Sequence, residues 1–324
     1  MRRAVLTPIA VVLGASLALA GCASNGGTEP EPSDTTTDAQ EPDATAPAVT
    51  STLATDIPAE QLPTATGAFG DKPELGFPSQ THLADGALHV ISEGDGAVVE
   101  AGDLLVANYL GQVWGGEVFD NSYDRGTPAA FPIGVGRVVT GWDQGLVGLK
   151  VGSRVLLSLP PDLGYGAAGN SGAGIGGEDT IVFVVDVVDT FGGDSAGQAD
   201  AAPGEALPDG GAQVTGELGS PATLEIPEGA SEPTEQASFV LGTGSGPAVK
   251  AGDSVIVHYA IESFDENPGY SSWTNGTPEQ LQVAAGSPLE ELVGVPVGSR
   301  VVITVPKTDA QSAFVLVMDL IAAA

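Results

Sequence analysis

The pattern of hydrophobic and polar positions divides the chain into two β-rich segments, residues 69–191 and 216–324. In each, short runs of valine, leucine and isoleucine are separated by glycine, which is typical of short strands. One stretch of the first segment departs from this pattern. Trp142, Leu146 and Leu149 are spaced so that they share one face of a short helix. We therefore expect an α+β fold in which a mostly antiparallel sheet wraps around a small helix.

The two segments also repeat each other. "VVEAGDLLVANYLG" (98–111) matches "AVKAGDSVIVHYAI" (248–261), and "GLKVGSRVLLSLPPD" (148–162) matches "GVPVGSRVVITVPKTD" (294–309). A third pair, "DTIVFVVDVVDT" (179–190) and "SAFVLVMDLIAA" (312–323), follows in the same order. Three ordered matches predict a duplicated domain.

Two polar segments mark the expected boundaries of the two domains. Residues 22–68 are rich in Pro, Thr, Asp, Ala and Glu, and we expect them to form a disordered acidic tether because they offer too little apolar surface to fold. Residues 192–215 have the same character and are expected to be an interdomain linker.

The first 21 residues indicate export. A positive start, an apolar run and "LAGC" (19–22) form a secretory signal that resembles the bacterial lipobox, in which the cysteine becomes lipidated. We expect Cys22 to anchor the mature protein to the outer face of the cell membrane. An ordinary signal peptide with an incidental cysteine is the alternative. Cys22 is the only cysteine of the chain, so no disulfide framework is available.

Charge and histidine content exclude several kinds of partner. The chain has 42 acidic against 10 basic residues, a formal charge of −32, which argues against nucleic acid because phosphate binding needs a basic surface. His82, His89 and His258 are scattered without the spacing of metal ligands, so we expect no metal site.

Residues 86–190 resemble FKBP-type peptidyl-prolyl cis-trans isomerases. The resemblance rests on Tyr109-x-Gly111, Phe119-Asp120-x-Ser122, Asp124-Arg125, Gly141-Trp142-x-x-Gly145, Val151-Gly152, Pro161-x-x-x-Tyr165-Gly166 and Phe183, in that order. It implies a curved antiparallel sheet around a short helix, with the ligand between them. With the repeat, it implies two tandem FKBP-like domains.

The resemblance also implies the site. It assigns catalytic roles to Tyr109, Phe119, Asp120, Val139, Trp142, Tyr165 and Phe183, and substrate-binding roles to Arg125, Phe131, Val138 and Ile175. Trp142 would form the floor of an apolar pocket, and Arg125 would hold Asp120 by a charge-assisted bond. No cofactor is implied. The implied partners are proline-containing exported polypeptides and macrolide ligands.

Some positions depart from the family pattern. Ala129 stands where the best-known members have another pocket aromatic, and Asn170 where some members have a histidine. In the second segment Tyr259 is kept, but "SPLEELVG" replaces the tryptophan-bearing helix and Trp273 is not in the position of the floor. We expect a degenerate domain without isomerase activity.

The sequence thus predicts a lipid-anchored isomerase that assists folding of exported proteins. Two alternatives remain open at this point. The same pocket would also suit a non-catalytic lipoprotein that binds a proline segment or a small ligand. In the other alternative, the molecule is mainly a scaffold whose working surface is the second domain.

Overall fold

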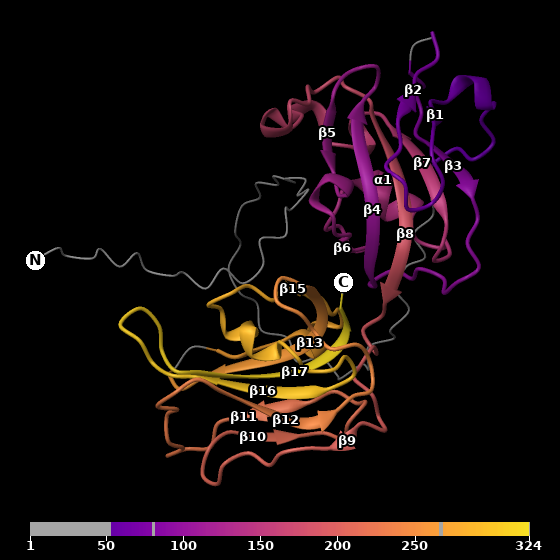
Figure 1. The fold of residues 1–324 in the computed structure, drawn as a ribbon. Helices are drawn as coiled ribbons and strands as arrows, with labels where there is room; N and C mark the ends of the chain where they lie inside the picture. The colour runs from indigo at the N-terminus through magenta and orange to yellow at the C-terminus, as the bar shows by residue number, and fades with distance from the viewer. Residues whose placement is uncertain (1–52, 80–81, 266–267, 324) are drawn as a thin grey trace, which may run out of the picture.

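The structure is a computed structural model that describes residues 53–79, 82–265 and 268–323. The predicted signal sequence and Cys22 lie outside the described residues. Two antiparallel sheets follow one another along the chain, and Figure 1 shows them as two bodies. The last strand of the first sheet, β8 (Ile181–Phe191), runs down to the second body.

The first sheet has six strands in the order β3-β7-β8-β4-β5, and β6 pairs with β4 beside β5. Its other strands are β3 (Ala87–Ser92), β4 (Leu104–Val113), β5 (Val118–Asn121), β6 (Ala129–Pro132) and β7 (Arg154–Leu159). The helix predicted around Trp142 is present as α1 (Thr140–Gly145), but it is shorter than the pattern predicts, because Leu146 is its C-cap and Leu149 lies beyond it. It packs against the concave face of the sheet.

The second sheet has seven strands in the order β14-β13-β17-β16-β12-β9, and β15 pairs with β13. Its strands are β9 (Ala202–Pro203), β12 (Ala237–Thr243), β13 (Ser254–Ser263), β14 (Tyr270–Ser271), β15 (Glu279–Gln282), β16 (Arg300–Val305) and β17 (Phe314–Ala323). Apart from β9, this is the strand order of the first sheet. The antiparallel sheet predicted for each segment is therefore present.

A wrapped α-helix in the second segment was also predicted, and this is wrong. The place of α1 is taken by the 3₁₀ helix η6 (Pro288–Leu292), because residues 283–299 form a shorter connection than residues 133–153 do in the first segment. The only α-helix described in the second segment is α2 (Ser272–Asn275), which lies elsewhere, between β14 and β15. The remaining 3₁₀ helices are η1 (Ala59–Gln61), η2 (Tyr123–Arg125), η3 (Pro161–Leu163), η4 (Gly166–Ala168) and η5 (Ser171–Ala173).

The disordered tether predicted for residues 22–68 is wrong for residues 53–68, which pack on the first sheet, and residues 22–52 lie outside the described residues. Leu53 and Leu62 are buried, and Ala54 forms a parallel bridge with Ala87. The hairpin of β1 (Thr64–Ala65) and β2 (Leu75–Gly76) continues this arm over the convex face of the sheet. A few apolar residues within the polar segment thus cover a sheet face that would otherwise meet water.

The linker predicted for residues 192–215 is also structured. β9 pairs with β12 at the sheet edge, and β10 (Gln213–Thr215) forms a hairpin with β11 (Thr223–Glu225). Leu224 of this hairpin is buried against Val302 and Val317 on the convex face of the second sheet. Each sheet is therefore covered on its convex face by the chain that precedes it, which explains why its central strands are apolar on both faces.

Each sheet contains a fully buried arginine that bonds both an aspartate and the covering arm. Arg154 bonds Asp186 with Nε at 2.5 Å and Nη2 at 2.8 Å, and its Nη2 also donates to the Asp71 carbonyl at 2.6 Å. Arg300 bonds Asp319 at 2.6 Å and donates to arm carbonyls, including that of Ser220. Burial acts to lower the pKa of Arg154, but the bonds to Asp186 outweigh it and raise that pKa.

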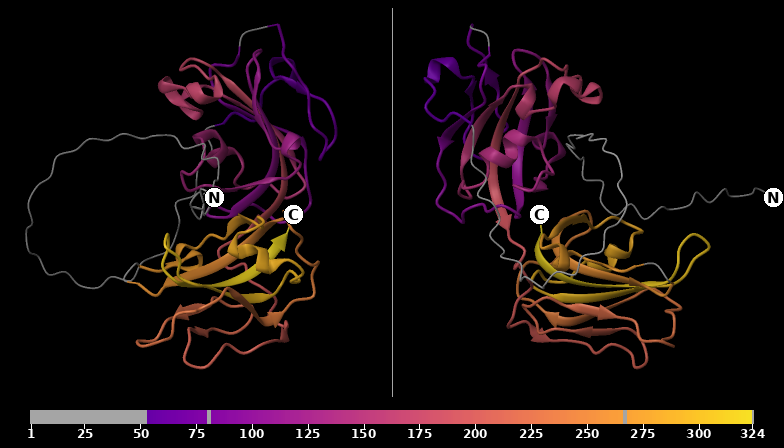
Figure 2. Two further views of the ribbon diagram at one scale, coloured as in Figure 1. Left: turned by 60° about the vertical axis from the view of Figure 1, so that its left-hand side comes forward. Right: turned by 180° about the vertical axis from the view of Figure 1, so that it is seen from behind.

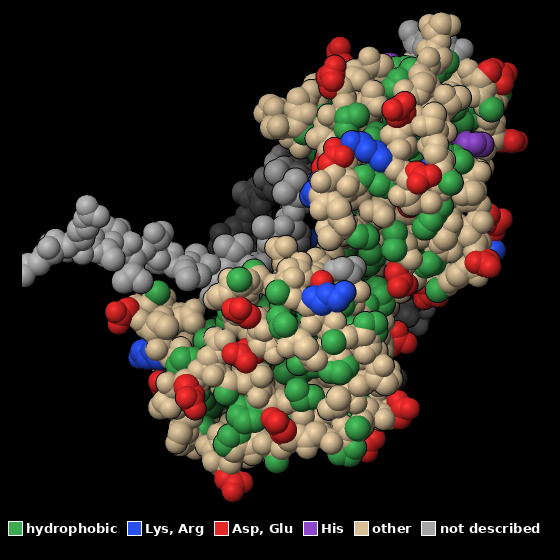
Figure 3. Space-filling model, in the orientation of Figure 1, with side chains coloured by type: hydrophobic (Ala, Val, Ile, Leu, Met, Phe, Trp, Pro, Cys, Tyr) green, Lys and Arg blue, Asp and Glu red, His purple; other side chains and the backbone are tan. Residues whose placement is uncertain are grey.

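Acidic side chains are spread over the visible face of both bodies, with few basic ones among them (Figure 3). Over the described part of the chain, helices are too short to cross a membrane.

Replacing Asp186 with Asn should lower the free energy of unfolding of the first sheet by about 3 kcal/mol or more, because it leaves the Arg154 charge buried without its counter-ion. Chemical denaturation followed by tryptophan fluorescence measures this loss. Glu93→Gln is the control, since it removes an exposed salt bridge to Lys150 in the same body. Equal stability of the two variants would contradict a structural role for the buried pair.

Candidate active site

An aromatic cluster on the concave face of the first sheet forms the candidate site. Trp142 of α1 is fully buried, and its ring meets those of Phe131, Phe183 and Tyr109 edge to face, with centroids at 5.0, 5.2 and 5.5 Å. Phe119 in turn meets Phe183 edge to face at 5.6 Å. Such geometry places the positive edge of one ring on the negative face of the next.

Two glycines allow this packing. A Cβ atom at Gly111 would lie 2.6 Å from the ring of Phe119 and 2.8 Å from that of Phe183, so glycine is needed where the two rings meet over β4. A Cβ atom at Gly141 would lie 2.2 Å from Leu159, so glycine also lets α1 approach β7 closely. The indole is held near the sheet as a result.

The loop that leads into α1 is held by Asp143. Its carboxylate accepts hydrogen bonds from the Gly134 and Gly136 amides at 2.7 and 2.8 Å. Burial raises the pKa of Asp143, while these backbone bonds oppose the rise. The loop ends at Val138 and Val139, which are buried against the aromatic cluster.

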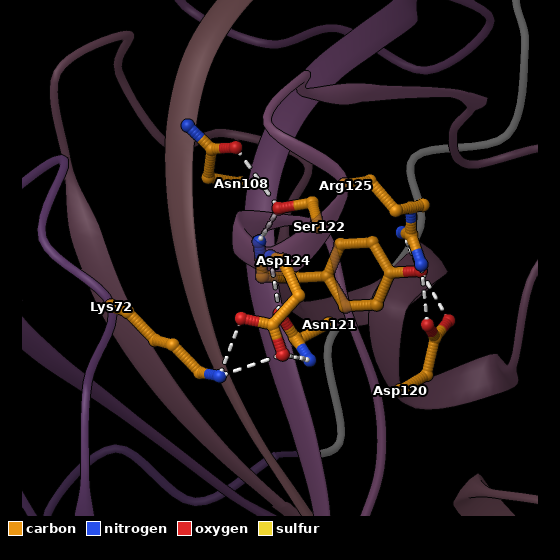
Figure 4. A network of polar contacts seen from close by, with 8 residues as sticks. Lys72, Asn108, Asp120, Asn121, Ser122, Asp124 and Arg125 are labelled. Carbon is orange, nitrogen blue, oxygen red and sulfur yellow. Dashed lines mark hydrogen bonds and ion pairs between the residues drawn. The ribbon is translucent and has the colours of Figure 1, made fainter.

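A polar wall closes one side of the cluster. The Tyr109 hydroxyl donates to Asp120, and Arg125 donates to Asp120 at 2.6 Å and to the Tyr109 oxygen at 2.8 Å (Figure 4). Burial, followed by the bond to Asp120, raises the pKa of Tyr109 far above its ordinary value. The predicted bond between Arg125 and Asp120 is thus present. It keeps the carboxylate beside the phenol.

The turn that carries this wall is fixed from behind. The Ser122 hydroxyl accepts from the Tyr109 amide and donates to Asn108, both at 2.9 Å (Figure 4). On the outer side, Lys72 of the N-terminal arm bonds Asp124 at 2.7 Å. The arm therefore supports the same turn that places Asp120 and Arg125.

Tyr165 lies at the rim, just before η4. Its hydroxyl and the Trp142 Nε1 are buried without a hydrogen-bond partner in the described structure. Burial raises the pKa of Tyr165 to about 12, against the opposing effect of the nearby Asn170 side chain. A buried donor without a partner costs about 1–3 kcal/mol, so each of these two groups carries an unused hydrogen-bonding capacity in the apolar cluster.

The structure brings together every pocket residue that the resemblance assigned. These are Tyr109, Phe119, Asp120, Arg125, Phe131, Val138, Val139, Trp142, Tyr165, Ile175 and Phe183. Asp143 was missed, because an acidic residue beside the tryptophan of a short helix is usually solvent-exposed. In the described residues, no group of His, Cys, Asp and Glu is arranged to hold a metal ion.

The second sheet lacks the features that make this pocket. By strand register, Ile261 takes the place of Gly111, and Tyr270 that of Asp120. Glu279 takes the place of Ala129 and accepts bonds from the hydroxyls of Tyr259, at 3.2 Å, and Tyr270. In the place of α1, η6 packs Leu292 and Leu289 into the core.

Trp273 does not replace the missing floor. It stacks on His258 with ring centroids 5.7 Å apart and packs with the convex-face cluster of the second sheet. The prediction that Trp273 is not a pocket floor is therefore confirmed.

Comparison with known proteins matches the first segment. The family described as FKBP-type peptidyl-prolyl cis-trans isomerase matches residues 96–188. An FK506-binding protein of Streptomyces anulatus is 45% identical over 119 residues, which cover 36% of this chain and 96% of that protein. FK506-binding protein 1 of Dictyostelium discoideum is 39% identical over 99 residues, covering 31% of this chain and 92% of that protein.

A further relative is larger than the matched segment. FKBP-type peptidyl-prolyl cis-trans isomerase FkpA of Escherichia coli is 40% identical over 114 residues, 35% of this chain and 40% of that protein. The crystal structure of FkpA matches with a TM-score of 0.31 and 37% identity over 34% of this chain and 50% of that one. From its sequence relatives and the matched family, the chain belongs to the FKBP-type peptidyl-prolyl cis-trans isomerases.

Proposed function

We propose that this isomerase acts on proline-containing segments of exported proteins, through the pocket of the first sheet. The observation that carries this proposal is the apolar aromatic cluster around Trp142 with the buried, unpartnered hydroxyl of Tyr165 at its rim. A proline ring is apolar and compact, while the amide beside it offers a carbonyl to a donor. In this proposal the aromatic cluster contacts the proline ring, and the Tyr165 hydroxyl donates to the carbonyl.

The reaction requires no bond to break. Rotation about a peptide bond faces a barrier of about 18–20 kcal/mol because the planar amide is stabilised by resonance. The twisted amide is less polar than the planar one, so an apolar site that excludes water favours it over the hydrated ground state. In our proposal Trp142, Phe119, Val139 and Phe183 surround the proline ring. The Val139 amide and the Tyr165 hydroxyl hold carbonyls on either side of it.

The polar wall would act on the twisting carbonyl. Tyr109 and Asp120 line the wall, and Arg125 fixes the carboxylate by a 2.6 Å bond. Because Arg125 holds Asp120 and Tyr109 in one arrangement, the wall keeps its shape when a substrate enters. The side chains act by position and charge in this scheme and exchange no proton with the substrate.

The second sheet would be a degenerate FKBP-like domain without isomerase activity. Its strand order supports common descent with the first, and Ile261 and Glu279 support the loss of the pocket. Ile261 places a branched side chain where the first sheet needs glycine, and Glu279 places a carboxylate inside.

The proposed location is the outer face of the cell membrane, with lipidated Cys22 as the anchor. This proposal rests on "LAGC" (19–22) and the preceding apolar run. Slow prolyl isomerisation is a step that exported chains must complete outside the cytoplasm, where such an enzyme would meet them.

Tyr165→Phe should lower isomerase activity without lowering the stability of the fold. It removes a buried hydroxyl that has no partner, so the free energy of unfolding should stay unchanged or rise. The loss of one bond to the substrate should lower kcat/KM by about 2- to 10-fold. A protease-coupled or NMR exchange assay on short X-Pro peptides measures the rate.

Tyr123→Phe is the matched control for this variant. The Tyr123 hydroxyl donates to Asp186 at 3.0 Å, outside the pocket, so its loss should reduce stability by about 1 kcal/mol and leave kcat/KM unchanged. If wild-type protein binds X-Pro peptides but does not speed their exchange, the proposed catalysis is wrong and the pocket is a binding site only.

FK506 should bind with a stoichiometry of one per chain and should abolish all isomerase activity at saturation. The relatives named FK506-binding proteins match only the first segment, and the second sheet carries Ile261 and Glu279 in the pocket positions. Isothermal titration calorimetry measures the stoichiometry. Two sites per chain, or activity that survives saturation, would show that the second sheet retains a working pocket.

Cys22→Ser should move the protein from the membrane fraction to the soluble fraction of a bacterial host and stop incorporation of a labelled fatty acid. The thiol is the only group in the motif that can carry the lipid. Retention of the Ser variant in the membrane fraction would contradict anchoring through this residue.

A further inference from the structure

The two bodies meet along the free edge of β6. In the described structure β6 pairs with β4, and its other side faces β15 of the second sheet. The carboxamide of Gln280 accepts a hydrogen bond from the Ala130 amide at 3.2 Å and donates one to the Pro128 carbonyl at 3.3 Å. A side-chain amide thus takes the place that the peptide group of a further strand would take at this edge.

Further contacts support the same junction. The hydroxyl of Thr277, in the turn before β15, donates to the Gly102 carbonyl at 3.0 Å. Leu104 and Val106 of β4 are 3% and 6% exposed because they form one apolar cluster with Ile256 of the second sheet. In Figures 1 and 2 the second body lies against the end of the first at which β6 is found.

The side chain of Phe131 connects β6 to the pocket. Phe131, the residue after Ala130, is buried and lies edge to face with both Trp142, at 5.0 Å, and Tyr109, at 5.6 Å. The chain leaving β6 then forms the loop that Asp143 holds and that ends at Val139. One continuous segment therefore runs from the edge held by Gln280 to the pocket wall.

The sequence of β6 allows the contact. Ala129 has a small side chain, so the carboxamide of Gln280 reaches the backbone groups on either side of it, the Pro128 carbonyl and the Ala130 amide. Within β15, Glu279 bonds the tyrosines of its own sheet and Leu281 is buried in its core. Gln280 and Gln282 point to the other side, as alternation along a strand requires.

We propose that the second domain braces the pocket of the first, with Gln280 as the positioning residue. Gln280 does not touch the substrate. It fixes the edge of β6, and through Phe131 it limits the movement of Trp142 and Tyr109. A pocket held in its binding geometry loses less conformational freedom when a substrate enters, which favours binding. This inference rests on the proposed function, in which the first pocket binds the X-Pro segment.

Gln280→Ala in the full chain should raise KM for short X-Pro peptides by about 3-fold or more and change kcat by less than about 2-fold, because a looser wall mainly weakens binding. Hydrogen exchange of the amides of residues 129–131 should become faster. The free energy of unfolding of each body should stay at its wild-type value, since the two lost bonds lie between the bodies.

Gln282→Ala is the matched control. Gln282 is exposed, lies two residues further along the same strand and points to the same side, so neither KM nor exchange in β6 should change. If Gln280→Ala behaves like Gln282→Ala in both measurements, the brace is refuted. An inactive wild-type protein would refute the proposed catalysis instead, and hydrogen exchange would still decide the brace because it needs no turnover.

Discussion

A buried arginine–aspartate pair at the centre of each sheet is the interaction on which the rest of the structure depends. Arg154 with Asp186, and Arg300 with Asp319, lie at most 2% exposed, where a charge is stable only if it is paired and hydrogen-bonded. The aspartates do not supply all of these bonds. Carbonyl groups of the preceding arm add further bonds to each arginine, at Asp71 in the first sheet and at Ser220 in the second. The pair therefore fixes the arm, and the arm covers the convex face.

The arm covers the convex face in both bodies, so the two bodies differ mainly on the concave face of each sheet. In the first sheet, Gly111 leaves room for Phe119 and Phe183 to meet, and α1 brings Trp142 down onto them. In the second, Ile261 occupies the glycine position and aliphatic side chains of η6 replace the indole. One strand order thus supports an aromatic pocket in one body and a filled core in the other. The difference lies in a few side chains and in the shorter connection that forms η6 in place of α1.

The sequence predicts the pocket well and the arms poorly, for a physical reason. Six of the pocket residues lie in strands or in α1, and the others lie in connections whose motifs follow one another in a fixed order along the chain. The arms are rich in proline, threonine and acidic residues, so their composition indicates disorder, yet Leu53 and Leu62 are buried. What stabilises them is a long-range contact with Arg154 and with a sheet face. The repeated "VGSR" (151–154 and 297–300) carried the signal for the buried arginines, but an arginine usually lies at a surface.

Gln280 was beyond prediction for a similar reason, since its partner is the backbone of a strand about 150 residues earlier. Its neighbour Glu279 explains how such a contact arises. Because side chains alternate along a strand, Glu279 points into the second body and Gln280 points out of it. The inward carboxylate bonds Tyr259 where the first body keeps Ala129, which is incompatible with an apolar proline site. The outer face of β15 carries Gln280, which holds β6. In the proposed scheme, the absence of a substrate site in the second body and the support of the first pocket follow from two adjacent residues.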